Sequence, residues 1–177
     1  MTLDLRSLGR PYVNQTLKEW FGEDFDVEAV FGYTHILTEK MLEEKGAPLK
    51  PGALEILTWL RNENITTAIA TANDFRHASA KLKRAGLDGY FDRIICADMV
   101  AHGKPAPDTY IFACRELGIA PERTFAVEDS PNGVLSAHGA GCKVIMVPDL
   151  TEPDDEIRKL LYARADTLAD IKKLVYE

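Results

Sequence analysis

The chain has 177 residues, of which 28 are acidic and 21 basic, giving a net charge of −7, and 46% are hydrophobic. This composition excludes wholesale disorder and fits one domain, with room for a small appendage. The acidic balance excludes a protein that binds nucleic acid mainly by neutralising phosphates. No apolar run reaches the roughly 20 residues of a membrane helix, and the first ten residues do not read as a signal peptide. We therefore expect a cytoplasmic protein with no membrane partner.

Three cysteines, Cys96, Cys114 and Cys142, lie far apart in the sequence among apolar residues. Their odd number and wide spacing fit neither a disulfide framework nor a metal site. The sequence predicts that all three are reduced, buried thiols.

The first part of the chain, residues 1–49, shows only helical patterns. Apolar residues recur at helical spacing over 12–21 and 27–44. Asp26 is the expected N-cap of the second helix, and Gly46 is its expected end. We treat residues 1–49 as one helical unit and residues 50–177 as the second domain.

From Pro51 onward, short apolar strands alternate with helices. Such alternation predicts parallel strands with right-handed crossovers, in a doubly wound, Rossmann-like α/β sheet. Sheets of this kind bind ligands beyond the carboxyl ends of their strands. Pro51 is expected at a first helical position and Asp108 at an N-cap. The pattern predicts strands at 65–71, 93–97, 124–127 and 143–147, and helices starting at Pro51 and at 74–85, 108–117, 130–139, 155–163 and 168–175.

The first strand is followed by Thr71, Ala72 and Asn73. A hydroxyl and successive backbone N–H groups at the start of a helix can hold a phosphate. The alternative is that Thr71 and Asn73 only complete a turn and cap the next helix. Taken alone, these residues favour the turn.

The second strand leads into a loop, 102–108, that reads His-Gly-Lys-Pro-Ala-Pro-Asp. Two prolines and a glycine stiffen this loop around Lys104. A lysine held in this way can neutralise a phosphate and a neighbouring carboxylate. The alternative is an ordinary solvated loop lysine.

The third strand ends in residues 128–133, Glu-Asp-Ser-Pro-Asn-Gly. The carboxylates of Glu128 and Asp129 can hold Mg²⁺, which prefers a few protein oxygens together with water and substrate phosphate. The alternative is a helix start, with Ser130 as the N-cap and the acids close to the helix dipole. For Asp129 the two interpretations remain open.

In this order, the motifs resemble those of the haloacid dehalogenase superfamily, and within it the β-phosphoglucomutase-like phosphatases and phosphomutases. Thr71 matches the second motif of the family, residues 103–107 match the third, and residues 128–133 match the fourth. The resemblance implies a Mg²⁺-dependent phosphatase or phosphomutase that acts on a small phosphorylated metabolite, such as a sugar phosphate.

The resemblance also implies roles for single residues. Thr71 and Lys104 would stabilise charge on the transferring phosphoryl group, and Glu128 and Asp129 would be the metal ligands. Residues 1–49 resemble the later part of a helical cap, in which Arg10 would contact substrate. The Lys104-Pro105 bond is a candidate cis peptide.

The first motif of the family, an apolar strand ending in Asp-x-Asp-Gly, does not occur in this sequence. Its first aspartate is the nucleophile, and its strand lies between those that end here at Thr71 and Glu128. Asp24 and Asp26 have the spacing, but an amphipathic helix follows them, so we interpret them as a cap loop. Without that strand the sheet has a gap. The two flanking strands then close on each other, another segment fills the gap, or the isolated chain is marginally stable.

Three hypotheses follow. The first is a truncated form of such a hydrolase, with little or no activity alone and monomeric unless another chain fills the missing strand. The second is a non-catalytic module that binds phosphate or sugar phosphates. The third is a receiver-type signalling domain, which ranks last because receivers carry their acids before the threonine and lysine, the reverse of the order here.

Overall fold

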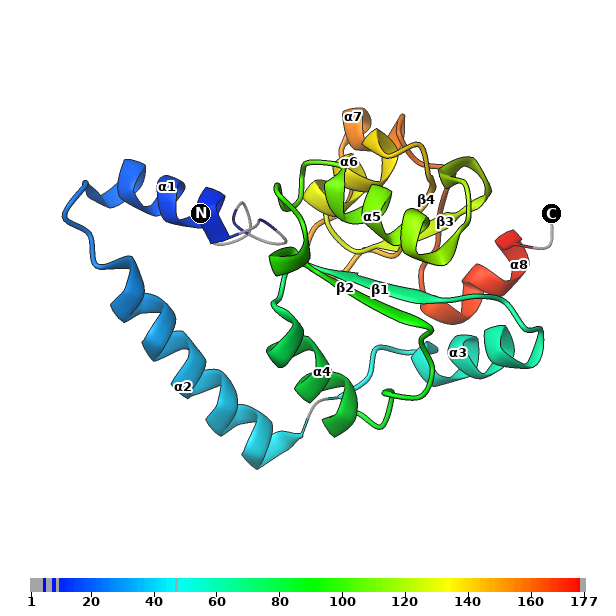
Figure 1. The fold of residues 1–177 in the computed structure, drawn as a ribbon, viewed down its shortest axis with the longest axis horizontal. Coiled ribbons are helices and arrows are strands. Elements are labelled where there is room, and N and C mark those ends of the chain that lie inside the picture. The colour runs from blue at the N-terminus through cyan, green and yellow to red at the C-terminus, as the bar shows by residue number, and fades with distance from the viewer. Residues whose placement is uncertain (1–4, 6–7, 9, 47, 176–177) are drawn as a thin grey trace.

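The computed structural model describes residues 5, 8, 10–46 and 48–175. Figure 1 shows two parts: an arm of two helices that projects to one side, and an α/β part that holds all the described strands. The arm consists of α1 (Arg10–Phe21) and α2 (Val27–Lys45). The boundary that we expected after residue 49 falls in the segment between α2 and the next helix. Within the described ranges, no helix is both long enough and apolar enough to span a membrane.

Local capping explains how the arm forms. The carboxylate of Asp26 accepts a hydrogen bond from the backbone N–H of Ala29 at 2.9 Å and so caps α2. Gly46, at a φ of 70°, ends the same helix, which confirms both predicted boundaries. Arg10 joins the two helices through an ion pair with Glu28 at 2.8 Å. The pair Asp24 and Asp26 therefore belongs to a helix start, as its sequence context indicates.

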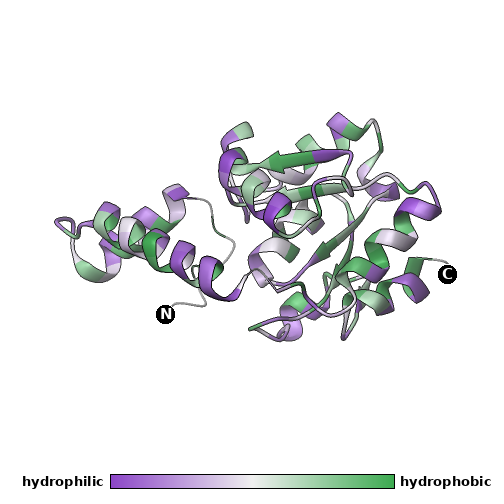
Figure 2. Ribbon diagram, turned by 90° about the horizontal axis from the view of Figure 1, so that it is seen from below, coloured by the Kyte–Doolittle hydropathy of each residue, from purple (hydrophilic) through white to green (hydrophobic). Residues whose placement is uncertain are grey.

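The α/β part alternates helices and strands as predicted. Three short 3₁₀ turns, at 97–99, 121–123 and 168–170, interrupt the alternation. The hydropathy colouring of Figure 2 shows the strands as largely hydrophobic between more mixed helices, as expected for strands covered on both faces. The elements are α3 (Ala53–Asn62), β1 (Ala68–Thr71), α4 (Phe75–Arg84), β2 (Arg93–Cys96), α5 (Asp108–Leu117), β3 (Phe125–Glu128), α6 (Pro131–Gly139), β4 (Lys143–Met146), α7 (Asp155–Arg158), β5 (Ala163–Arg164) and α8 (Ile171–Val175).

One predicted helix start and one predicted N-cap are wrong. Pro51 precedes α3, whose N-cap is Gly52 at a φ of 78°. A Cβ at Gly52 would lie 2.4 Å from the backbone nitrogen of Ala169, so only glycine fits at this N-cap. Asp108 is the first residue of α5 and not its N-cap, a position held by Pro107.

The helix predicted over 155–163 is also wrong in its second half. It ends at Arg158, and 163–164 form the short strand β5 beside β4. The backbone N–H of Tyr162 donates to the carbonyl of Val144 at 2.8 Å, just before this strand. Pairing with β4 therefore outweighs the local helical preference of this segment.

The strands form two separate hydrogen-bonded groups, both parallel. β1 pairs with β2, and β3 pairs with β4, which pairs with β5. Within the described residues, no ladder joins β1 to β3, so each has one unpaired edge. The possibility that these strands close on each other is not realised. The side chains of β1 are all only partly buried, and Val127 of β3 is 40% exposed, although both strands are apolar.

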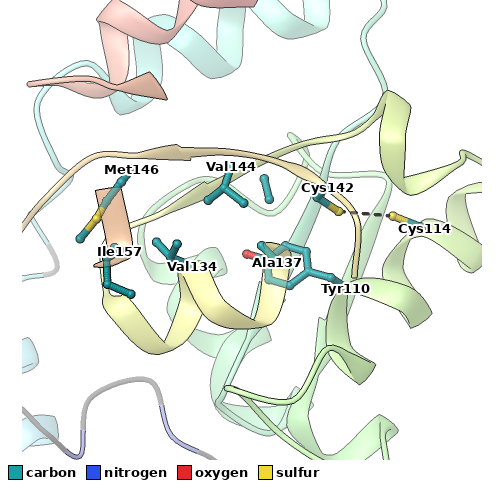
Figure 3. Close-up of a cluster of buried hydrophobic side chains, with 9 residues drawn as sticks. Tyr110, Cys114, Val134, Ala137, Cys142, Val144, Met146 and Ile157 are labelled. Atoms are coloured by element: carbon teal, nitrogen blue, oxygen red, sulfur yellow. Dashed lines mark hydrogen bonds between the residues drawn. The ribbon is translucent and has the colours of Figure 1, made fainter. Parts of the chain in front are cut away.

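The core lies on both faces of β4. Val144 and Met146 face the cluster drawn in Figure 3, which includes residues of α5, α6 and α7. Ile145, between them in sequence, faces the opposite cluster with Ile56 of α3 and Ile171 of α8. This alternation is that of a doubly wound sheet. All three cysteines are free and buried, as predicted.

Asp74 begins the helix that follows β1, and its carboxylate accepts a hydrogen bond from the backbone N–H of His77 at 2.9 Å. This bond lowers the pKa of Asp74 below its usual value of 3.8. We expect Asp74→Ala to lower the free energy of unfolding by about 1 kcal/mol at pH 7. Because the folded-state pKa is lowered, this contribution is present above pH 3.8 and is lost as the pH falls through the folded-state pKa.

Urea denaturation of the wild-type protein and the Asp74→Ala variant at pH 7 and near pH 3 measures this difference. The matched control is Asp88→Ala, which removes an exposed aspartate from the loop after α4. The capping role would be contradicted if both variants lost the same free energy of unfolding at pH 7. It would also be contradicted if the loss for Asp74→Ala were as large near pH 3 as at pH 7.

Candidate active site

A cavity of about 630 Å³ lies where β1 and β3 end. It is lined by residues from all three predicted strand ends, which the sequence separates widely. In the cavity wall, the loop that carries Lys104 lies beside the ends of β1 and β3, two strands that do not pair with each other. The predicted residues on its wall are Thr71, Ala72, Asn73, Lys104, Glu128 and Asp129.

Lys104 is buried, with 5% of its surface exposed. Its ammonium donates to the backbone carbonyl oxygen of Ala70 at 3.0 Å and to Oε1 of Glu128. The alternative of a solvated loop lysine is therefore wrong, because this lysine is fixed between β1 and β3. The Lys104-Pro105 bond is cis, as predicted.

Glu128 is also buried, at 6% exposed, and its Oε1 atom accepts a second hydrogen bond from the hydroxyl of Tyr110. On its other side the carboxylate lies directly against Gly133, where an added Cβ would be 1.9 Å from Oε2. Burial, and then the charge and hydrogen bond of Glu128, raise the pKa of Tyr110 well above its usual value. The Tyr110 hydroxyl therefore remains a donor at neutral pH.

The turn after β1 is built around the hydroxyl of Thr71. Its Oγ1 accepts hydrogen bonds from the backbone N–H and from the side-chain amide of Asn73, both at 3.1 Å. Thr71 and Asn73 therefore do complete a turn, but the residue that caps the next helix is Asp74 and not Asn73. A hydroxyl that accepts these bonds retains its own proton, which can be donated to a ligand in the cavity.

The acidic end of β3 combines a cap with a candidate metal site. Ser130 caps α6 by accepting from the backbone N–H of Gly133 at 3.3 Å, as predicted. Carboxylate oxygens of Glu128 and Asp129 suit Mg²⁺, but Oε1 of Glu128 already serves Lys104 and Tyr110. In the part of the chain that the structure describes, no group of three or more potential side-chain ligands gathers around one point. The two acids therefore form an incomplete ligand set.

The rim of the cavity includes residues that the sequence did not single out. Lys50, before α3, forms an ion pair with Asp149, which follows β4. Asp166 and Thr167 follow β5 on the same rim. The position of Asp149, Asp166 and Thr167 after strand ends could have indicated these residues. For Asp166 and Thr167 the signal was missing, because β5 was not predicted. Tyr110, on the first turn of the helix after the lysine loop, was missed as well.

Arg10 is not brought to the cavity. Its guanidinium pairs with Glu28 and lies 3.4 Å from the ring centre of Phe31, all within the helical arm. The arm thus satisfies the charge of Arg10 internally. Its contact with substrate remains a prediction.

Comparison with known proteins gives consistent matches. The family model for haloacid dehalogenase-like hydrolases matches residues 7–141. Hexitol phosphatase A of Escherichia coli (strain K12) is 34% identical over 145 residues, covering 78% of this chain and 67% of that protein. Protein CbbY of Cereibacter sphaeroides is 37% identical over 134 residues, covering 73% of this chain and 56% of that protein. The matches thus span about half to two thirds of these curated relatives.

Solved structures agree with the sequence matches. The structure of CbbY from Rhodobacter sphaeroides in complex with phosphate has a TM-score of 0.72 at 29% identity, covering 84% of this chain and 67% of that one. A CbbY variant in complex with xylulose-(1,5)bisphosphate has a TM-score of 0.63 at 34% identity, covering 69% and 55%. The fold, the order of motifs and the matched length lead to one conclusion: this chain belongs to the haloacid dehalogenase-like hydrolases.

Proposed function

We propose that this chain supplies the phosphate-binding and charge-stabilising part of a sugar-phosphate phosphatase. The observation that carries the proposal is the buried Lys104, held between β1 and β3 at the wall of a cavity that Thr71 also lines. The named relatives that bind or hydrolyse phosphorylated carbohydrates support the substrate class. A cavity of this volume is large enough for a small phosphorylated sugar.

In this proposal the phosphate lies between the first two strand ends. The hydroxyl of Thr71 and the backbone N–H groups that follow it donate to phosphate oxygens, while Lys104 neutralises charge. Because these donors are fixed before substrate arrives, they stabilise the charge that develops on the transferring oxygens. Glu128 keeps the buried ammonium paired when no phosphate is bound.

The residues proposed to hold Mg²⁺ are Glu128 and Asp129. When bound, the ion would polarise the phosphoryl group and offset its negative charge. One more carboxylate is needed, because the two acids provide few oxygens and one of those is already engaged. We therefore expect Mg²⁺ to bind weakly to this chain alone.

The proposed reaction also needs a nucleophilic carboxylate, which attacks phosphorus and displaces the sugar as its alcohol; water then hydrolyses the aspartyl phosphate, which releases phosphate and restores the carboxylate. The other two carboxylates that line the cavity, Asp149 and Asp166, are engaged in ion pairs with Lys50 and Arg164, and Asp26 caps a helix in the arm. We propose that an extended segment fills the gap between β1 and β3 and brings this carboxylate to the cavity. The unpaired edges of both strands support this proposal.

Two measurements on the purified chain test the proposal. Calorimetric titration with inorganic phosphate and with a hexitol phosphate is expected to show binding. Mg²⁺-dependent phosphate release from the same ester is expected to be no higher than in the Asp129→Asn variant. Activity that is lost in Asp129→Asn would show that a carboxylate of this chain is the nucleophile. Absence of binding would remove the proposed phosphate site.

Adding a synthetic peptide that can act as the missing strand distinguishes a hydrolase from a module that only binds phosphate. The test adds a short apolar peptide that ends in Asp-x-Asp-Gly, with an Asn-x-Asn-Gly peptide as the matched control. If the gap accepts the strand, the first peptide is expected to give Mg²⁺-dependent turnover and the second none. Phosphate binding without turnover under either condition would favour the non-catalytic module.

A further inference from the structure

Tyr110 makes two independent contacts with the charged pair of the cavity, and the proposed reaction gives it no role. It is buried on α5, at 7% exposed. Its hydroxyl donates to Oε1 of Glu128, and its ring centre lies 5.0 Å from the ammonium nitrogen of Lys104. Figure 3 shows Tyr110 beside Val134 and Ala137, so the ring also belongs to the packed core.

The direction of a lysine ammonium is set by its acceptors, because its four-carbon stem is flexible. The Lys104 ammonium has three N–H groups, of which two serve described acceptors: the carbonyl of Ala70 and Oε1 of Glu128. The remaining N–H can serve a ligand in the cavity. Its direction is therefore fixed only as long as the Glu128 carboxylate stays in place.

Besides Lys104 itself, two groups hold that carboxylate in place. Gly133 touches one side of it, and only the absence of a Cβ there makes room for it. The Tyr110 hydroxyl holds the same oxygen that Lys104 uses. Without the hydroxyl, the carboxylate can turn about its last bond and take the ammonium with it.

We propose that Tyr110 is a positioning residue of the phosphate site: through Glu128 its hydroxyl keeps the free N–H of Lys104 directed into the cavity. This inference rests on the proposed function, since it assumes that Lys104 binds phosphate. Tyr110 itself does not touch the ligand.

Tyr110→Phe tests the proposal, because it removes the hydroxyl and keeps the ring that packs against Lys104. Calorimetry with inorganic phosphate is expected to show about fivefold to tenfold weaker binding. The ¹H–¹⁵N resonance of the Lys104 ammonium, assigned by its absence in Lys104→Arg, is expected to be visible in the wild-type protein and lost in the variant. Tyr162→Phe, which removes a hydroxyl from a half-exposed ring next to Phe125, is expected to change neither.

A double-mutant cycle distinguishes an effect that acts through Glu128 from a general structural effect of Tyr110→Phe. If Tyr110 acts through Glu128, Tyr110→Phe in a Glu128→Gln background is expected to weaken phosphate binding less than twofold further. A fully additive loss would overturn the proposal, and so would wild-type affinity with an unchanged ammonium resonance in Tyr110→Phe.

The ammonium resonance is measured without phosphate, so it separates this proposal from the proposed function. If the wild-type protein binds no phosphate, the proposed function fails and the positioning role in phosphate binding fails with it. If the wild-type protein binds phosphate and the resonance survives in Tyr110→Phe, only the role of Tyr110 is wrong. Should Tyr110→Phe fold poorly, Glu128→Gln alone still tests the link, because it is expected to weaken the resonance.

Discussion

Replacing Lys104 by methionine is expected to abolish detectable phosphate binding and to lower the free energy of unfolding by about 3–5 kcal/mol. Both partners of the Lys104–Glu128 pair are only 5% exposed at their side chains. Methionine fills much of the same space but leaves the buried Glu128 carboxylate without its counter-charge. Urea denaturation gives the stability change, and calorimetric titration with phosphate gives the loss of binding.

The double variant Lys104→Met/Glu128→Gln is the matched control, because it removes both buried charges together. We expect it to recover most of the lost stability while phosphate binding remains absent. Surface substitutions usually change the free energy of unfolding by no more than about 0.5 kcal/mol. If the single Lys104→Met variant stays within this range, Lys104 and Glu128 do not form a buried ion pair that the fold depends on. Phosphate binding by the double variant would contradict the role of the lysine.

Gly133→Ala is expected to lower the free energy of unfolding by about 1–3 kcal/mol and to weaken phosphate binding. The added Cβ would lie 1.9 Å from Oε2 and 2.2 Å from Cδ of Glu128. A carboxylate at the end of a side chain could normally move aside, but this one is held by Lys104 and Tyr110. Moving it breaks contacts that position the ammonium, so stability and binding fall together.

Gly139→Ala provides the control within the same helix, α6. There the nearest atom to an added Cβ is Cβ of Pro107 at 3.6 Å, an ordinary contact. Since alanine favours a helix over glycine by up to about 1 kcal/mol, this variant is expected to be as stable as wild type or more so. Equal stability of Gly133→Ala and Gly139→Ala in thermal or urea unfolding would show that Glu128 is free to move.

The sequence predicts the fold well because local signals and tertiary packing agree in most of it. The apolar strands alternate with capped helices, and α5 begins and ends where the pattern indicates, at Asp108 and Leu117. The prediction failed where contacts with residues far away in the sequence decide the local structure. The N-cap of α3 must be glycine because the backbone at Ala169 leaves no room for a Cβ, and β5 forms where it can pair with β4.

The candidate site was predictable as far as it follows the strand ends. Parallel strands bring their carboxyl ends to one edge, so Thr71, Lys104 and Glu128 line one cavity. Tyr110 was not predictable, because a tyrosine among apolar residues on a helix has the pattern of a core residue. Its polar role depends on a carboxylate that only the folded chain places beside it. The metal ligands and the role of Arg10 remain predictions.

The two separate strand ladders bear on how the molecule unfolds. Both apolar clusters include residues of β4, whereas β1 contributes to one of them only through the partly buried Ala70. The β1–β2 ladder depends for its attachment on the packing of α5 and on the bond from Lys104 to Ala70. Since local stability follows buried apolar contacts, β1 and β2 are expected to open at a lower free energy than β3 and β4. An element that bridges β1 and β3 would therefore join two semi-independent units into one cooperative domain.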